Sequence, residues 1–277
     1  MTAFTLKIIA VITMLLDHTY VVFPLTFPLW FRFIGRIAFP VFAYMIAQGC
    51  KHTSNINKYV LRLGIFALVS EVPFDIAFLN EISFINDTNI FYTLFLGAAC
   101  IAVFEKIRNK LSDPEPNGDS TDEQVVKSAS GSKSTLARAV LPVLPILPIA
   151  LLGNLLGTDY GTLGVACILV FYFAKPENRL TRTLAATCII IYMYGDPRML
   201  SYLVSYVEGI SASNPIQDAA MSIPPDMLNY FLFALISVLL VLLYNGKQGS
   251  KVKWAFYAFY PVHLAILAAI RHIAGQG

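Results

Sequence analysis

Six ionisable residues of this 277-residue chain lie inside long apolar segments, where such side chains are uncommon. They stand in three close pairs, which are Asp17 with His18, Arg32 with Arg36, and Glu71 with Asp75. Ionisable groups within a membrane are costly and persist where they pair with one another or face water. The set therefore fits two interpretations: an ion-pair network that packs helices together, or a polar chamber for acid–base chemistry.

Helix geometry predicts that these pairs meet at a similar depth. We expect apolar helices over 5–23, 30–49 and 59–79, and at about 1.5 Å per residue most of the charged positions fall roughly 6–12 Å below their outer ends. Residues four apart share a helix face, and like charges at that spacing repel. We therefore expect the two arginines to face the two carboxylates of the third segment. Asp17 and His18 point about 100° apart, so if His18 faces the chamber, Asp17 is expected to pair with an arginine.

His18 and His263 are the candidate general bases. An imidazole with an ordinary pKa of about 6.5 can move protons at neutral pH. His263 lies about 15 Å deep in an apolar segment expected over 254–273, where a hydrogen bond to a neighbouring group would explain it equally well. We take His18 as the first choice and His263 as the second.

We assign catalytic or substrate-binding roles to the other charged and aromatic residues according to their side-chain chemistry. We assign Asp17 and Arg36 to the catalytic group, because either Arg32 or Arg36 can stabilise an oxyanion or orient Asp17. The residues expected to bind the acceptor substrate are Arg32, Glu71, Asp75, Asp159, Tyr160 and Tyr260. The carboxylates among them suit an amine.

A short, basic, glycine-containing stretch, YNGKQGSK (244–251), is the candidate site for a phosphate-bearing cofactor. Its candidate residues are Asn245, Lys247 and Lys251, although a plain turn between helices explains the stretch as well. No metal site is expected, because the sequence has no HExxH, CxxC or carboxylate–histidine pair at helical spacing. The four cysteines lie in or beside apolar segments and are expected to be small buried residues, not disulfide partners.

The composition indicates that membrane helices hold these residues. Hydrophobic residues make up 57% of the chain and charged residues 13%, with a mean hydropathy of +0.65. Soluble domains carry about 25% charged residues, which excludes a soluble globular protein and a disordered chain. The net charge of +3 is too small to indicate a nucleic-acid partner.

We therefore predict an all-α, polytopic membrane helix bundle of about nine transmembrane helices (8–10), since roughly 17–25 apolar residues cross a bilayer as a helix. The expected spans are 5–23, 30–49, 59–79, 90–105, 139–156, 160–174, 183–195, 226–244 and 254–273.

The placement of lysine and arginine predicts the orientation in the cell membrane. Most of the 20 basic residues lie at the start of the first span (Lys7) or in the loops 50–62, 105–138, 175–182 and 245–253, and the alternate loops contain no lysine. By the positive-inside rule, these basic loops and the N-terminus are cytoplasmic. With nine spans, the C-terminus lies outside.

Two segments depart from the regular pattern. Residues 109–134 are polar and rich in Ser and Asp, so we expect a disordered cytoplasmic loop within a single integral membrane domain. Pro142, Pro145 and Pro148 predict a kinked or irregular fifth span. No internal repeat is evident, which weakens a transporter hypothesis.

Several stretches resemble the TraX family of membrane proteins, which is named for the factor that N-acetylates conjugative pilin. They are LKIIAVITMLLDH (6–18), FIGRIAFPVFAYMIAQG (33–49), YVLRLGIFALVSEVPFDIAF (59–78), DYGTLGV (159–165), LLYNGKQG (242–249) and FYAFYPVHL (256–264). The resemblance implies acetyl transfer to an amino group. A looser similarity extends to multi-span acyltransferases that use cytosolic acyl-CoA and carry an early-span histidine and arginine and a Tyr-Pro-x-His-like last span.

Placement, chemistry and this resemblance together predict an integral membrane acetyltransferase. Acetyl-CoA is the expected donor, and an amine-bearing acceptor, a pilin-like N-terminus or an envelope component, is expected at the outer side. Membrane lipids are the other expected partners. Two alternatives remain open: a proton-coupled transporter in which Asp17, His18 and Glu71 form a relay, and a non-catalytic envelope assembly factor.

Overall fold

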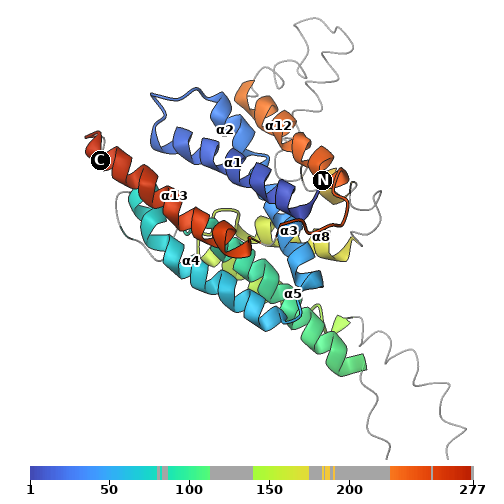
Figure 1. Ribbon diagram of the computed structural model, residues 1–277. Coiled ribbons are helices and arrows are strands. Elements are labelled where there is room, and N and C mark those ends of the chain that lie inside the picture. The colour runs from blue at the N-terminus through green and yellow to red at the C-terminus, as the bar shows by residue number, and fades with distance from the viewer. Residues whose placement is uncertain are drawn as a thin grey trace, which may run out of the picture.

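The computed structural model is a bundle of α-helices (Figure 1). It describes residues 1–79, 82, 87–112, 140–174, 183, 185–187, 190, 225–250 and 252–275. The helices are α1 (Ala3–Val22), α2 (Trp30–Gly35), α3 (Ala38–His52), α4 (Ile56–Phe78), α5 (Ile90–Ser112), α7 (Ile146–Leu155), α8 (Gly161–Phe173), α12 (Pro225–Leu242) and α13 (Lys253–Ile273). The predicted all-α membrane bundle is confirmed.

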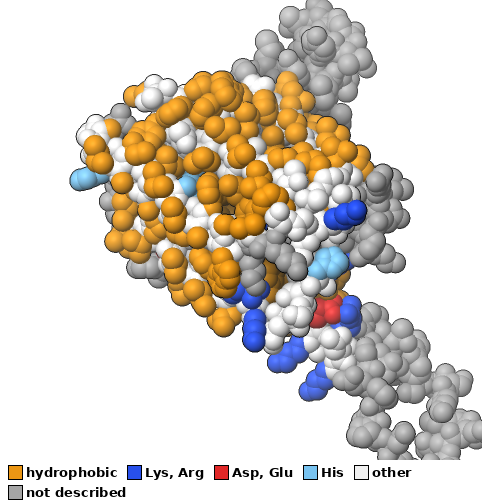
Figure 2. Space-filling model, in the orientation of Figure 1, with side chains coloured by type: hydrophobic (Ala, Val, Ile, Leu, Met, Phe, Trp, Pro, Cys, Tyr) orange, Lys and Arg blue, Asp and Glu red, His pale blue; other side chains and the backbone are white. Residues whose placement is uncertain are grey.

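The face of the bundle drawn in Figure 2 is largely apolar, and Lys and Arg side chains gather at one end of that face. Four of the described helical segments are long and apolar enough to cross a membrane: Ala3–Val22, Trp30–His52, Ile90–Leu111 and Trp254–Ile273. Shorter apolar helices cover Ile146–Leu155, Gly161–Phe173 and Leu228–Leu242. The chain is therefore a membrane protein, while the number of its spans stays a prediction.

Helix α4 has the side-chain distribution of a helix that faces lipid. Large apolar side chains are exposed along it: Leu61, Ile65, Leu68, Val72 and Ile76. Glu71 and Asp75, by contrast, are fully buried in the bundle. A surface helix of a soluble protein has the opposite distribution. Lipid on the outside explains both faces, because it solvates apolar side chains and leaves ionisable groups to the protein interior.

Helices α1 and α13 run parallel to each other. Lys7 lies over the Phe256 ring near the start of both helices, and His18 reaches His263 further along both. Each helix therefore begins at the same end of the bundle, and the two chain termini lie at opposite ends (Figure 1). α13 also packs along α4, so three helices surround the histidines.

The expected span 30–49 is divided into α2 and α3 by two turn residues, Arg36 and Ile37. Their amides each donate to the carbonyl three residues earlier, at 3.1 Å. Pro40 has no N–H to donate to the Arg36 carbonyl, so the helical hydrogen bonds are interrupted here. The break lets α2 pack on α1 and α12, while α3 packs on α8 in the core.

Two predicted boundaries are wrong. Residues 109–112, expected in the disordered loop, form the end of α5, which the ion pair between Glu105 and Arg108 supports. α7 begins at Ile146 and not at 139, because turns occupy 141–145 and prolines cannot donate helical hydrogen bonds. The predicted irregularity of this span is confirmed. Residues 113–134 and most of the expected span 183–195 lie outside the described residues.

Candidate active site

Asp17 holds two arginines near the end of α1. Its carboxylate accepts a hydrogen bond from Arg32 Nη1 at 2.8 Å, and Arg36 Nη2 lies 3.0 Å from both carboxylate oxygens. Asp17 is buried, whereas the side chains of Arg36 and Arg32 are 14% and 33% exposed. The predicted pairing of Asp17 with an arginine is confirmed, and Arg32 is the more exposed of the two cations.

Gly35 allows the two helices to meet at this ion-pair cluster. A Cβ atom at position 35 would lie 2.4 Å from Cβ and Oδ1 of Asp17, which is closer than any real contact of this kind. Glycine is therefore required for α2 to approach α1 closely. The approach brings Arg32 and Arg36 within hydrogen-bonding reach of one carboxylate.

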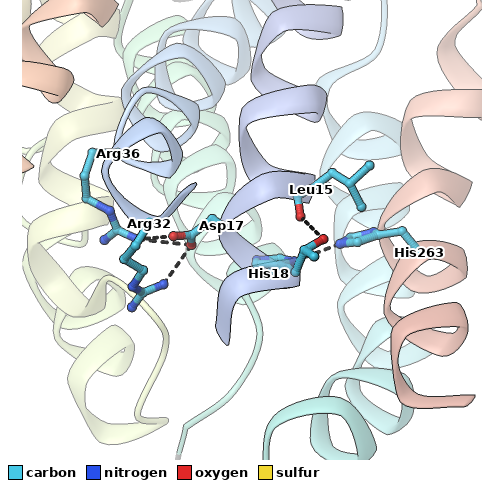
Figure 3. A network of polar contacts seen from close by, with 7 residues as sticks. Leu15, Asp17, His18, Arg32, Arg36 and His263 are labelled. Carbon is cyan, nitrogen blue, oxygen red and sulfur yellow. Dashed lines mark hydrogen bonds and ion pairs between the residues drawn. The ribbon is translucent and has the colours of Figure 1, made fainter. Parts of the chain in front are cut away.

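The next residue of α1, His18, forms a hydrogen bond with His263 of α13. His18 Nδ1 lies 2.8 Å from His263 Nε2, and His263 Nδ1 lies 2.8 Å from the carbonyl oxygen of Phe259. Figure 3 shows Asp17 pointing toward the arginines and His18 pointing toward α13. The two candidate bases are therefore one unit, which we call the histidine pair.

The hydrogen bonds determine the tautomers of an uncharged histidine pair. A carbonyl oxygen can only accept, so Nδ1 of His263 carries a hydrogen and donates it to Phe259. Nε2 of His263 is then an acceptor, and Nδ1 of His18 donates to it. This arrangement leaves the lone pair on Nε2 of His18, the atom that can take up a proton.

Aromatic rings enclose the histidine pair. Phe78 and Tyr260 meet the His18 ring edge-on at centroid distances of 5.2 and 5.8 Å, and Phe259 stacks on His263 at 4.7 Å. His263 and Tyr260 are buried, while His18 is half-buried. The surroundings therefore keep His263 from water and leave His18 the more accessible imidazole.

The turn between α7 and α8 carries Asp159 and Tyr160. The backbone of Thr88 pairs with this turn through hydrogen bonds of 3.0 and 3.1 Å, and Tyr160 stacks on Phe39 with centroids 3.7 Å apart. Asp159 keeps an exposed surface, so its carboxyl can meet a charged substrate.

The prediction that the carboxylates of α4 face the arginines is wrong for Glu71. Its Oε2 accepts a hydrogen bond from the backbone N–H of Asn89 at 3.2 Å and another from the Asn89 side-chain amide. That amide also donates to the Ala67 carbonyl at 2.8 Å, and Asn89 Oδ1 accepts from Phe91 N at 2.9 Å. Glu71 thus fastens the start of α5 to α4. Asp75 is fully buried one turn further along α4.

The candidate cofactor loop is fastened to the N-terminus. The Met1 ammonium donates to the Leu243 carbonyl at 2.6 Å, and the Asn245 amide donates to the Met1 carbonyl at 2.9 Å. The Asn245 side chain accepts from the Lys247 amide at 3.0 Å. These contacts are those of an interhelical turn, with the Lys247 side chain exposed. Lys251 lies outside the described residues.

The prediction that the cysteines are buried and not disulfide-bonded is confirmed for three of the four residues. Cys50, Cys100 and Cys167 are buried free thiols, and Cys188 lies outside the described residues. Among the residues that the structure describes, no group of three or more histidine, cysteine or carboxylate side chains could hold a metal ion.

Sequence reasoning missed three residues that shape the site. Asn89 directly precedes the apolar segment 90–105, which is a typical helix N-cap position and could have indicated its role. Gly35 acts through the absence of a side chain, and Phe259 through its backbone carbonyl. Neither of these two roles leaves a signal in residue type or spacing.

The chain is similar to known proteins over nearly its whole length. The family described as TraX protein matches residues 3–271. A probable fimbrial assembly protein FimC, serogroup H1, of Dichelobacter nodosus is 25% identical over 285 residues, which cover 97% of this chain and 95% of that protein. No solved structure matches. The ion-pair cluster and the histidine pair both lie inside the matched range.

Proposed function

The chain belongs to the TraX family, and we propose that it is a membrane acyltransferase that transfers an acetyl group from acetyl-CoA to an amino group. The histidine pair carries the proposal, because its hydrogen bonds leave a lone pair on His18 Nε2. The adjacent residue in the chain, Asp17, holds two guanidinium groups. Acyl transfer to an amine is catalysed by a base that takes the proton of the amine and by donors or cations that stabilise the oxyanion, and these two groups can supply both.

In the proposed reaction, the amine nitrogen attacks the thioester carbonyl, and a C–N bond forms as the C–S bond breaks. His18 Nε2 takes the proton that the amine loses and returns it to the leaving thiolate. The products are the N-acetylated acceptor and coenzyme A. His263 is a positioning residue, since it accepts from His18 Nδ1 and keeps the reactive nitrogen unprotonated.

The ion-pair cluster supports the developing negative charge of the tetrahedral intermediate. We propose that Arg32 stabilises the oxyanion, because its side chain is more exposed than that of Arg36. Asp159 is the proposed carboxylate that accepts a hydrogen bond from the acceptor amine, since it keeps an exposed surface while Glu71 and Asp75 are fully buried.

The name of the relative and the charge distribution of the chain support a choice of acceptor and of its side of the membrane. The similar protein of Dichelobacter nodosus is called a fimbrial assembly protein, so a pilin-like N-terminus is the proposed acceptor, with an envelope component as the second choice. The positive-inside rule supports a cytosolic donor and an acceptor at the outer side.

The proposal is tested by acetyl-CoA turnover in proteoliposomes with an amine-rich envelope extract from the host. His18→Ala should lower kcat by about 10²- to 10⁴-fold, the usual contribution of a general base. His272→Ala is the matched control, because His272 is exposed at the end of α13. Coenzyme A release and mass spectrometry of the acceptor are the measurements, with size-exclusion chromatography to check folding.

A non-catalytic role in fimbrial assembly is the second candidate, which the name of the relative favours. It predicts that the His18→Ala protein supports assembly as well as the wild type does. Wild-type protein that neither binds nor consumes acetyl-CoA would overturn the acyltransferase proposal and favour this role.

A further inference from the structure

A pocket of about 250 Å³ opens at the basic end of the bundle, where α3 ends and α4 begins. Side chains from α1, α3, α4, α5 and α13 line it, together with Gln248 from the loop before α13. None of the described residues that line it is acidic, while Lys7, His52 and Arg62 are basic. The charge of the pocket therefore suits an anion.

Arg62 provides a second, independent indication of a ligand. Its Nε is buried and has no hydrogen-bond partner, although its guanidinium lies 5.7 Å from the centroid of the Tyr59 ring. A buried N–H without an acceptor costs free energy, so each such group needs an explanation. A phosphate oxygen in the pocket would supply the acceptor, and Lys7, half-buried in the same wall, would add a positive charge.

Aromatic side chains connect this pocket to the histidine pair. Phe91 and Tyr257 line the pocket, and Phe91 meets the Tyr260 ring edge-on at 5.3 Å. Tyr260 in turn contacts both His18, at 5.8 Å, and His263, at 5.4 Å. On α1, His18 follows Lys7 by eleven residues, about 16 Å at 1.5 Å per residue. An extended pantetheine arm can cover that distance.

We propose that this pocket binds the acyl donor: Lys7 and Arg62 hold the phosphates of coenzyme A, and the pantetheine arm runs along Phe91 and Tyr257 toward Tyr260 and His18. The assignment rests on the proposed function, since it names the donor site of that reaction. It also moves the donor phosphates away from Lys247 and Lys251. Gln248 is the residue of that loop which lines the pocket.

The test uses full-length protein in lipid nanodiscs with and without phosphatidylglycerol. Lys7→Gln and Arg62→Gln should each weaken coenzyme A binding by about tenfold or more, as expected when one charge-assisted contact is lost. The KM for acetyl-CoA should rise by a similar factor with little change in kcat. Lys7→Arg and Arg62→Lys keep the charge and should retain most of the binding. Lys58→Gln is the matched control, because Lys58 is exposed in the first turn of α4 and does not line the pocket.

Each outcome separates this inference from the proposed function. If the wild type consumes acetyl-CoA and both pocket variants behave like Lys58→Gln, the pocket assignment fails alone. If the wild type binds coenzyme A through Lys7 and Arg62 but releases none from acetyl-CoA, the proposed function fails and the binding site stands. If the variants no longer bind phosphatidylglycerol but still bind coenzyme A as the wild type does, the pocket is a lipid headgroup site, and the donor assignment is overturned.

Discussion

The imidazole of His263 accepts from His18 on one side and donates to the Phe259 carbonyl on the other. A positioning role predicts that His263→Ala lowers kcat by about 10- to 100-fold, part of the roughly 10²–10⁴-fold contribution of a general base. The KM for acetyl-CoA should not change. His263→Gln should recover part of the activity, because an amide oxygen can accept from His18 Nδ1. Steady-state acetyl-CoA turnover separates kcat from KM.

The control for this prediction is His272→Gln, a change at an exposed position near the end of the same helix. A His263→Ala protein with full activity would contradict the positioning role. Equal inactivity of both His263 variants, with a lowered melting temperature, would show that His263 only packs the helix.

At the scale of helices, the contact between α1 and α2 depends on Gly35. Because an added Cβ would lie 2.4 Å from Asp17 Cβ, Gly35→Ala should push α2 away and weaken both Arg–Asp contacts. Such overpacking costs about 1–3 kcal/mol of the free energy of unfolding. Thermal unfolding in detergent measures the loss. Gly64→Ala is the control, since its Cβ would meet the edge of the Phe95 ring at 3.2 Å and that ring can shift. Equal melting temperatures for the two variants would refute this account.

The junction between α4 and α5 depends on Asn89, which caps α5 and donates to the buried Glu71. Asn89→Ala should cost about 1–3 kcal/mol beyond the loss of a helix cap, because Glu71 loses a donor inside the bundle. Asn55→Ala measures the cap alone, since Asn55 caps α4 at an exposed position. Thermal unfolding of both variants gives the difference.

Combining Asn89→Ala with Glu71→Leu provides the second arm of this experiment. Replacing both partners with apolar groups can be nearly neutral, so the double variant should be more stable than Asn89→Ala. A double variant that is less stable would mean that Glu71 has another partner that matters more.

The elements of this fold could be predicted from the sequence, but most of the contacts within the candidate site could not. Membrane helices are marked by local hydropathy, which is why α1, α4 and α13 fall within a few residues of their expected bounds. Spacing tells which residues share a helix face but not toward which neighbour that face turns. The predicted contact between Asp17 and an arginine is therefore present, whereas Glu71 binds Asn89 and not an arginine. His18 and His263 are separated by 245 residues, and their contact follows from the packing of α1 on α13.

At the scale of the whole molecule, the parallel run of α1 and α13 places the chain termini at opposite ends (Figure 1). This arrangement agrees with an odd number of spans, as in the nine-span prediction. The basic residues gathered at one end predict that this end faces the cytoplasm (Figure 2). The proposed donor pocket lies at the same end as Lys58, and the Arg271 side chain contacts the Ala77 carbonyl at the other.

Single cysteines test this orientation in a background where the four native cysteines are alanine. Leu25→Cys, at a fully exposed position in the loop after α1, and Ala274→Cys, after α13, should react with a membrane-impermeant maleimide in intact cells. Lys58→Cys should react only after permeabilisation, because positively charged loops stay in the cytoplasm. Labelling of Ala274→Cys together with Lys58→Cys would contradict the odd number of spans. Reversed labelling of all three would put the pocket outside, where cytosolic acetyl-CoA could not reach it, so the donor assignment would fail even if the histidine pair were shown to act as a base.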